Sequence, residues 1–183
     1  MTGPLQETCA GNAVVSPCGR YRYFLQRRWS ETGGIVVWIM LNPSQADASR
    51  NDPTIRRCMS FSRQWGCGAM IAVNLYALRA TNPDDLLREE NAVGAENDIH
   101  LAMACREADG DASGRSAVVA AWGKHPLARA RAGEALRLAG SGLHCLGTTA
   151  DGSPRHPLYV PSAQPLVPYR QVTPGSKKPP GFR

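Results

Sequence analysis

The chain has 183 residues, of which 43% are hydrophobic and 20% are charged. This length and composition predict one globular domain with a full core and exclude a disordered or fibrous chain. No apolar run reaches the roughly 18 residues that a membrane span requires, and residues 1–15 lack the basic start and apolar stretch of a secretion signal. We therefore expect a cytoplasmic protein that does not bind a membrane.

The net charge of +6 comes largely from the C-terminal tail, residues 170–183. The tail has no acidic residue and four basic ones, Arg170, Lys177, Lys178 and Arg183. Removing these four from the 21 basic residues leaves 17 against 15 acidic residues, so the rest of the chain carries only +2. Such a tail can bind phosphates by releasing counterions, but most basic tails are simply soluble chain ends.

The six cysteines are spread along the chain, and none belongs to a Cys-x-x-Cys pair. Closely spaced zinc or iron–sulfur ligands are therefore not predicted, and we expect neither a metal nor a cofactor. We interpret most of the cysteines as small buried side chains in a reducing compartment.

The N-terminal part predicts two short antiparallel strands, at 13–15 and 20–28, which would extend one edge of a sheet. The second strand has four arginines, and we interpret them as charges that protect an exposed edge. A strip that faces phosphates is the alternative. The four residues are Arg20, Arg22, Arg27 and Arg28.

Four apolar runs farther along predict parallel strands, and the segments between them have helical patterns. The runs are 35–41, 69–75, 117–123 and 143–147; the predicted helices are 53–64, 83–87, 94–108 and 126–139. In the helix at 94–108 we expect Ile99, Ala102 and Met103 to face the core. This order predicts a three-layer α/β sandwich with a central four-stranded, mostly parallel sheet, in a single domain at 14–169 with flexible termini at 1–13 and 170–183. No glycine-rich nucleotide-binding loop follows any of the strands.

The loop after the first apolar run is unusually polar. Asn42-Pro43-Ser44 ends the strand, and Asp47 and Asp52 follow. Asp52 before Pro53 is a good N-cap, so a capped, solvated connector is one interpretation of this loop. A cap does not explain Asn42 or Asp47. Open α/β sheets bind ligands outside the carboxyl ends of their strands, so we expect a site here.

Polar and aromatic residues follow all four predicted strands and would meet on one rim. Carboxylates with a histidine suit the activation of water and the stabilisation of a leaving group, whereas aromatics and amides suit the reading of a planar base. Each residue also has a structural interpretation, as a cap, a turn, a core residue or a solvated surface. The rim residues are Asn42, Ser44, Asp47, Asp52, Asn74, Tyr76, Arg79, Trp122, Lys124, His125, Arg155 and His156.

Six separate words of the sequence resemble a bacterial and phage family known only as a domain of unknown function, family 1643. The words are IMLNPSQAD, NDPTIRRC, VNLYALRAT, AAWG, CLG and DGSPRHPLYVP. The resemblance covers roughly residues 21–169 and implies no activity.

A second, looser resemblance is to the uracil-DNA glycosylases, which have four parallel strands between helices. It implies that Asn42 with Asp47 or Asp52 orients water, that Asn74 reads the base, and that His156 stabilises the leaving base. The chain departs from that family in two places. The residues after His156-Pro157 read Leu-Tyr-Val-Pro instead of a serine-rich turn, and the first loop is longer and more acidic. The choice between the two aspartates and the identity of the substrate therefore stay open.

The leading hypothesis is an enzyme that hydrolyses the N-glycosidic bond of a nucleobase in DNA or in a nucleotide. One alternative is a non-catalytic nucleic-acid-binding module of the same fold, and another is an enzyme that acts on a small nucleoside-type metabolite. A monomer is the default expectation. Substrate contacts are assigned to Ser44, Asn74, Tyr76, Arg79, Trp122 and Arg155, and nucleic-acid contacts to Arg56, Arg57, Lys124, Lys177 and Lys178.

Overall fold

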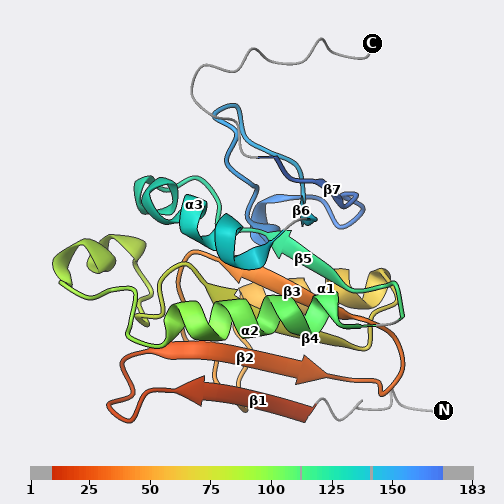
Figure 1. The fold of residues 1–183 in the computed structure, drawn as a ribbon, viewed down its shortest axis with the longest axis horizontal. Coiled ribbons are helices and arrows are strands. Elements are labelled where there is room, and N and C mark those ends of the chain that lie inside the picture. The colour runs from red at the N-terminus through yellow and green to blue at the C-terminus, as the bar shows by residue number, and fades with distance from the viewer. Residues whose placement is uncertain (1–9, 112, 141, 171–183) are drawn as a thin grey trace.

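The computed structural model describes residues 10–111, 113–140 and 142–170. One mixed sheet of seven strands runs through it, in the order β1-β2-β4-β3-β5-β6-β7 (Figure 1). The strands are β1 (Ala10–Val15), β2 (Arg22–Arg28), β3 (Ile35–Met40), β4 (Ala69–Asn74), β5 (Ala117–Ala120), β6 (Leu143–Cys145) and β7 (Val167–Pro168). The helices are α1 (Pro53–Gln64), α2 (Asn97–Asp109) and α3 (Pro126–Ala139), with two 3-10 helices, η1 (Pro83–Arg88) and η2 (Pro157–Tyr159). The prediction of an α/β fold is therefore confirmed.

The four strands in the middle of the sheet, β4-β3-β5-β6, are parallel and correspond to the four apolar runs. The sheet itself has seven strands rather than four. β1 and β2 extend one edge in antiparallel pairs, as the sequence predicts. β7 extends the other edge antiparallel to β6, and the sequence does not predict it. Residues 10–13 belong to β1, so the prediction that they are part of a flexible terminus is wrong; the rest of the two predicted flexible ends, apart from Arg170, lies outside the described residues.

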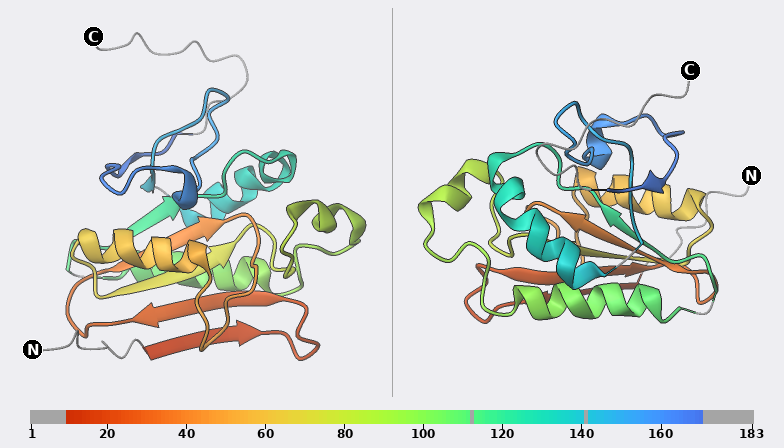
Figure 2. Two further views of the ribbon diagram at one scale, coloured as in Figure 1. Left: turned by 180° about the vertical axis from the view of Figure 1, so that it is seen from behind. Right: turned by 45° about the horizontal axis from the view of Figure 1, so that its top comes forward.

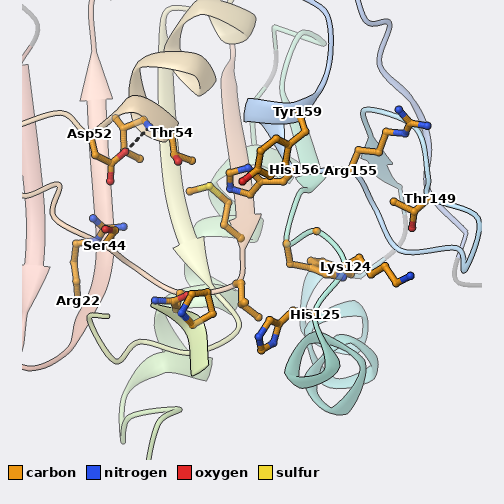
Figure 3. Close-up of a pocket in the computed structure, with 17 residues that line it drawn as sticks. Arg22, Ser44, Asp52, Thr54, Lys124, His125, Thr149, Arg155, His156 and Tyr159 are labelled. Carbon is orange, nitrogen blue, oxygen red and sulfur yellow. Dashed lines mark hydrogen bonds between the residues drawn. The ribbon is translucent and has the colours of Figure 1, made fainter. Parts of the chain in front are cut away.

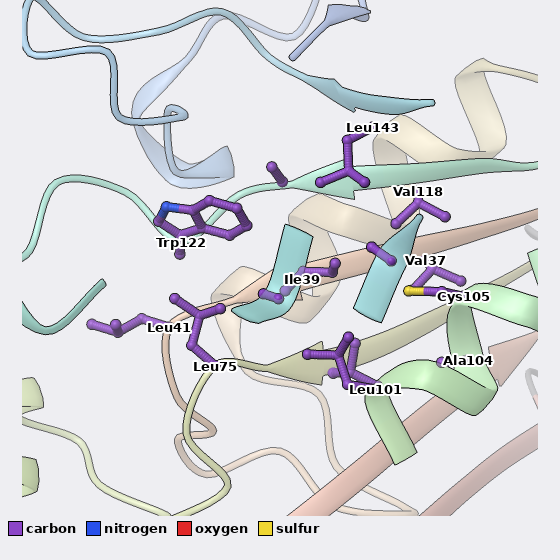
Figure 4. Packing of buried hydrophobic residues seen from close by; sticks show 14 of the residues in the cluster. Val37, Ile39, Leu41, Leu75, Leu101, Ala104, Cys105, Val118, Trp122 and Leu143 are labelled. Atoms are coloured by element: carbon purple, nitrogen blue, oxygen red, sulfur yellow. The ribbon is translucent and has the colours of Figure 1, made fainter. Parts of the chain in front are cut away.

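Helices cover both faces of the sheet. α1 lies on one face, and α2 and α3 lie on the other (Figure 2). On the α1 face, Trp38 is fully buried between Phe61 and Trp65, and its indole N–H donates to Ser62 Oγ at 3.0 Å. The opposite face holds the larger apolar cluster, which reaches from Val37 across α2 and α3 (Figure 4). None of the helices in the described residues is long and apolar enough to cross a membrane.

The inward face of α2 differs from the predicted one. Ile99 and Met103 are 60% and 58% exposed, and Ala102 is only half-buried. Apolar residues occur all round this helix, so their spacing does not determine its phase, and small side chains allow a close approach to the sheet. The buried apolar residues are Leu101, Ala104, Cys105 and Ala108.

The order of the parallel strands reverses at β3. The chain passes from β3 through α1 to β4 on one side, and then returns through α2 to β5 on the other side of β3. In open α/β sheets, ligands bind outside the carboxyl ends of the strands at such a reversal. The loops after β3 and β5 therefore border the expected site.

Candidate functional site

A pocket of about 460 Å³ lies at the carboxyl ends of the parallel strands, where their order reverses. We call it the switch-point pocket. Its wall comes from the loop after β3, the first turn of α1, the segment after β5, and the C-terminal segment that contains η2 (Figure 3). Eight of the predicted rim residues line it: Asn42, Ser44, Asp52, Trp122, Lys124, His125, Arg155 and His156.

Asp52 performs two tasks at once. Its Oδ1 accepts the backbone N–H of Ile55 at 2.8 Å and so caps α1. The half-buried side chain also lines the switch-point pocket. Among the described residues, its second carboxylate oxygen has no hydrogen-bond partner. This oxygen is therefore available to a bound molecule or a water.

Asp47 is placed differently and does not line the switch-point pocket. Its Oδ1 accepts three hydrogen bonds from its own loop, from the Ser49 N–H at 2.9 Å, the Ser49 hydroxyl at 3.0 Å and the Arg50 N–H at 2.8 Å. The bonds from Ser49 and Arg50 lower the pKa of this carboxyl. Of the two aspartates that the sequence leaves open, Asp47 holds the loop, and Asp52 is the one in the pocket.

Two further rim residues are buried away from the pocket. Asn74, at the end of β4, is fully buried, and its amide nitrogen and oxygen have no partner in the described residues. Tyr76 is 7% exposed and donates its hydroxyl hydrogen bond to the Leu127 carbonyl at 3.0 Å. Asn74 therefore does not line the switch-point pocket, where a residue that reads the base would have to lie.

The arginines predicted to contact nucleic acid are engaged within the protein. Arg57 donates to the carbonyls of Val160 at 2.7 Å and Pro157 at 3.3 Å, and to the hydroxyl of Ser162 at 2.7 Å. It thereby fastens the C-terminal segment to α1. Arg56 donates to the carbonyl of the loop residue before Asp52, at 2.7 Å.

Three further basic residues with predicted roles are Arg79, Lys177 and Lys178. Arg79 does not line the switch-point pocket and borders two other cavities instead. Lys177 and Lys178 lie outside the described residues.

His156 caps η2, because its Nδ1 accepts the backbone N–H of Leu158 at 3.3 Å. The neutral ring therefore carries its proton on Nε2. Burial lowers the pKa of His156, and the charge of Asp52 opposes this shift. The ring also lies against Tyr159, with the ring centres 5.6 Å apart. His156 therefore provides the pocket with a neutral N–H donor at physiological pH.

His125 lines the pocket and also has structural contacts. Its Nδ1 accepts the Leu127 N–H at 3.3 Å and caps α3, and its Nε2 lies 3.4 Å from Asp84. Trp122 is 4% exposed and packs edge-on against Tyr169, so it forms a firm wall of the pocket.

Arg22 lines the pocket, whereas the sequence interpretation placed it on an exposed edge of the sheet. It is only 1% exposed, because β1 covers the outer edge of β2 and the loop after β3 closes over it. Its Nη1 donates to the Ala46 carbonyl at 2.7 Å, whereas its Nε has no partner among the described residues. Arg27 on the same strand is 2% exposed. These two arginines do not protect an exposed edge, and only the alternative of a phosphate-facing strip pointed to Arg22.

The switch-point pocket is rich in positive charge. Three cations line it, Arg22, Lys124 and Arg155, against a single carboxylate, Asp52. Lys124 is mostly exposed and lies 3.9 Å from Asp151, outside the lining. Among the described residues, no group of three or more His, Cys, Asp and Glu could hold a metal ion. The pocket therefore suits an anionic molecule.

The fold and the pocket define a class: a three-layer α/β protein with a polar, cationic pocket where the strand order of its sheet reverses. The chain belongs to the family described as "Protein of unknown function (DUF1643)", whose sequence profile matches residues 22–158, and this confirms the resemblance carried by the six words. No curated protein matches the chain. The comparisons give no support to a relation with the uracil-DNA glycosylases.

Proposed function

We propose that the protein is a hydrolase that cleaves the N-glycosidic bond of a nucleobase, in a nucleotide or in DNA, with a site arranged like that of a uracil-DNA glycosylase. One observation carries the proposal: Asn42, Asp52 and His156 all line a single pocket at the carboxyl ends of the strands. A carboxylate, an amide and a neutral histidine are the groups that this reaction needs.

Asp52 and Asn42 would orient the attacking water. Asp52 uses one carboxylate oxygen for the cap, and the other would accept a hydrogen bond from the water. Asn42 donates its amide hydrogens to the carbonyls of Pro43 and Ala80, at 3.1 and 2.8 Å, which fixes the side chain and leaves Oδ1 available. The water forms a bond to the sugar carbon and passes its proton to Asp52, while the carbon–nitrogen bond breaks.

His156 would stabilise the leaving base. The bonding electrons depart with the base, and the Nε2–H of the neutral ring donates a hydrogen bond to the base anion. A neutral donor suits this task, because the ring keeps its proton on Nε2 when Nδ1 is held by Leu158.

The volume and wall of the pocket suit a base with its sugar. At about 460 Å³ it falls within the range of roughly 300–1,000 Å³ that is typical of small-molecule sites. The apolar side chains of Met40, Leu41, Ile55 and Trp122 line part of it. Tyr159, which is 81% exposed beside His156, offers an aromatic face at the mouth. Because Asn74 is buried elsewhere, base recognition would fall to the lining residues.

The test is release of a free base. The protein would be incubated with nucleotides, with nucleosides, and with oligonucleotides that contain uracil, hypoxanthine, hydroxymethylated or glycosylated bases. Chromatography detects the base, and alkali cuts any abasic site. Asp52→Asn should abolish release, whereas Asp47→Asn, which keeps an acceptor for its loop, should not. Absence of release from every substrate, with folded protein, would refute the proposal.

A specific observation favours small substrates over a nucleic-acid-binding module. Arg56 and Arg57 are used within the protein, and Arg79 lies outside the switch-point pocket. The second candidate is therefore an enzyme that acts on a small nucleoside-type metabolite. It predicts thermal stabilisation by such molecules and none by DNA.

A further inference from the structure

We propose that Arg22 is the phosphate-binding residue of the switch-point pocket, and that the pocket takes a small molecule with a terminal phosphate, of the mononucleotide class. The inference narrows the substrate of the proposed reaction and rests on the proposed function in that respect. The binding itself needs no assumption about the reaction.

Arg22 is a buried charge with open hydrogen-bond donors. It is 1% exposed and forms no ion pair with any carboxylate of the described residues. Its Nη1 is bound to the Ala46 carbonyl, and its Nε is buried without a partner. A buried charge without a partner is costly, so an anion that enters the pocket and accepts from this guanidinium would be favoured.

Arg27 shows what a purely structural arginine looks like on the same strand. Its Nε donates to Asn51 Oδ1 at 2.8 Å, its Nη1 to the Gln26 carbonyl at 2.8 Å, and its Nη2 to the carbonyls of Arg50, at 3.2 Å, and Asp47. All three nitrogens hold the protein together. Arg22 has the same burial and uses one of its three nitrogens in this way. Arg22, unlike Arg27, lines the switch-point pocket.

The guanidinium stays charged in this place. Burial lowers the pKa of Arg22 to about 10, and the nearby charge of Asp52 acts in the opposite direction. At neutral pH the side chain therefore remains a cation that can form two parallel hydrogen bonds to phosphate oxygens.

The charge of the lining favours an anion. Its three cations outnumber its one carboxylate. Although Lys124 lies 3.9 Å from Asp151, Arg22 and Arg155 have no carboxylate partner among the described residues. Figure 3 shows Arg22 and Asp52 on one side of the pocket and His156 on the other. A ligand seated on Arg22 would therefore lie next to the proposed catalytic groups.

A terminal phosphate fits this position better than an internal one. The guanidinium is almost wholly enclosed, so the group that reaches it must enter the pocket. An internal phosphate of DNA carries a sugar on both sides, and the chain would have to pass through the pocket twice. A mononucleotide can place its phosphate on Arg22 and its base against the apolar wall.

The experiment measures binding by calorimetry at constant ionic strength, with chloride as the balancing anion. The probes are inorganic phosphate, deoxyuridine 5′-monophosphate, deoxyuridine, and an oligonucleotide with internal phosphates only. We expect phosphate to bind and the nucleotide to bind at least tenfold more tightly than the nucleoside. Arg22→Gln should weaken phosphate and nucleotide at least tenfold and leave the nucleoside unchanged. Arg56→Gln, in an exposed arginine of α1, is the matched control and should bind like the unaltered chain.

A second measurement needs no loss of the side chain. In the unaltered protein, phosphate should shift the ¹⁵N resonance of the Arg22 Nε–H, which is assigned through its covalent connection to the Arg22 backbone. This settles the matter even if Arg22→Gln fails to fold.

Three results would overturn the inference: no phosphate binding, unchanged binding in Arg22→Gln, or an oligonucleotide that binds through Arg22 more tightly than the nucleotide. Binding through Arg22 without release of a base would support the inference and count against the proposed reaction. Release of bases from within DNA, without phosphate binding, would support the proposed reaction and count against the inference.

Discussion

Replacing Asp52 separates its structural task from its proposed chemical one. Asparagine caps helices about as well as aspartate, so Asp52→Asn keeps the acceptor for the Ile55 N–H at 2.8 Å. It loses only the favourable charge at the helix N-terminus, about 0.3–1 kcal/mol. Asp52→Ala loses the cap as well, for a total of about 1–2 kcal/mol. In a chain of this size, 1 kcal/mol lowers the Tm by roughly 2–4 °C.

The assay combines urea unfolding with base release and with phosphate binding. Both variants should release no base, although Asp52→Asn should be nearly as stable as the unaltered chain. Both should bind inorganic phosphate more tightly, because the one carboxylate that lines the pocket among the described residues is removed or replaced by a neutral amide. Full activity in Asp52→Asn would refute the water-orienting role. Equal stability of the alanine and asparagine variants would refute the cap, and weaker phosphate binding in Asp52→Asn would contradict the charge argument.

Three more predictions concern the surroundings of the pocket. Arg57→Ala should lose about 2–3 kcal/mol of unfolding free energy, because three hydrogen bonds from a charged donor disappear; Arg56→Ala should lose less than about 0.5 kcal/mol, and equal losses would contradict this. Burial lowers the pKa of His156, so as pH falls below about 6.5 the unfolded chain takes up its proton first and stability declines. His156→Asn should remove that part of the decline in urea titrations between pH 8 and 5, and an unchanged pH slope would argue against the buried neutral ring. Ser62→Ala leaves the indole N–H of Trp38 unpaired and should cost about 1–3 kcal/mol; a Tm equal to that of the unaltered chain would show that the bond contributes nothing.

The central parallel strands could be predicted because their sequence signal is local. β3 and β4 are buried at every position, and a strand buried on both faces has a continuous apolar run. β7 lacks such a signal. It has two residues, Val167 and Pro168, and exists only because the chain returns beside His144 and Cys145. The phase of α2 was missed for a related reason, since packing on the sheet, rather than hydrophobic spacing, selects its buried side.

The site was only partly predictable for a different reason. The rule that polar residues gather at the carboxyl ends of parallel strands brings Asn42 and Asp52, in the loop after β3, together with His156, which lies far along the sequence. The rule does not tell which strand end is covered by other parts of the chain. The end of β4 is covered, and Asn74 is therefore buried. Arg22 precedes the parallel strands and is held at the pocket by residues distant in sequence: its backbone N–H donates to the Ala77 carbonyl, and its Nη1 donates to the Ala46 carbonyl, 24 residues away. No local pattern distinguishes it from Arg27.

The polarity of the loop after β3 is mostly structural. The Asp47 carboxylate accepts bonds from its own loop, Asn51 accepts one from Arg27, and Arg27 also binds the loop carbonyls. A polar loop is therefore a weak sign of chemistry until its internal hydrogen bonds are counted. Once they are, the groups of the pocket lining that have no partner among the described residues include Asn42 Oδ1, one oxygen of Asp52 and the Nε of Arg22. All three side chains line the switch-point pocket, so a substrate that enters it meets an acceptor pair for water and a donor for an anion in the same place.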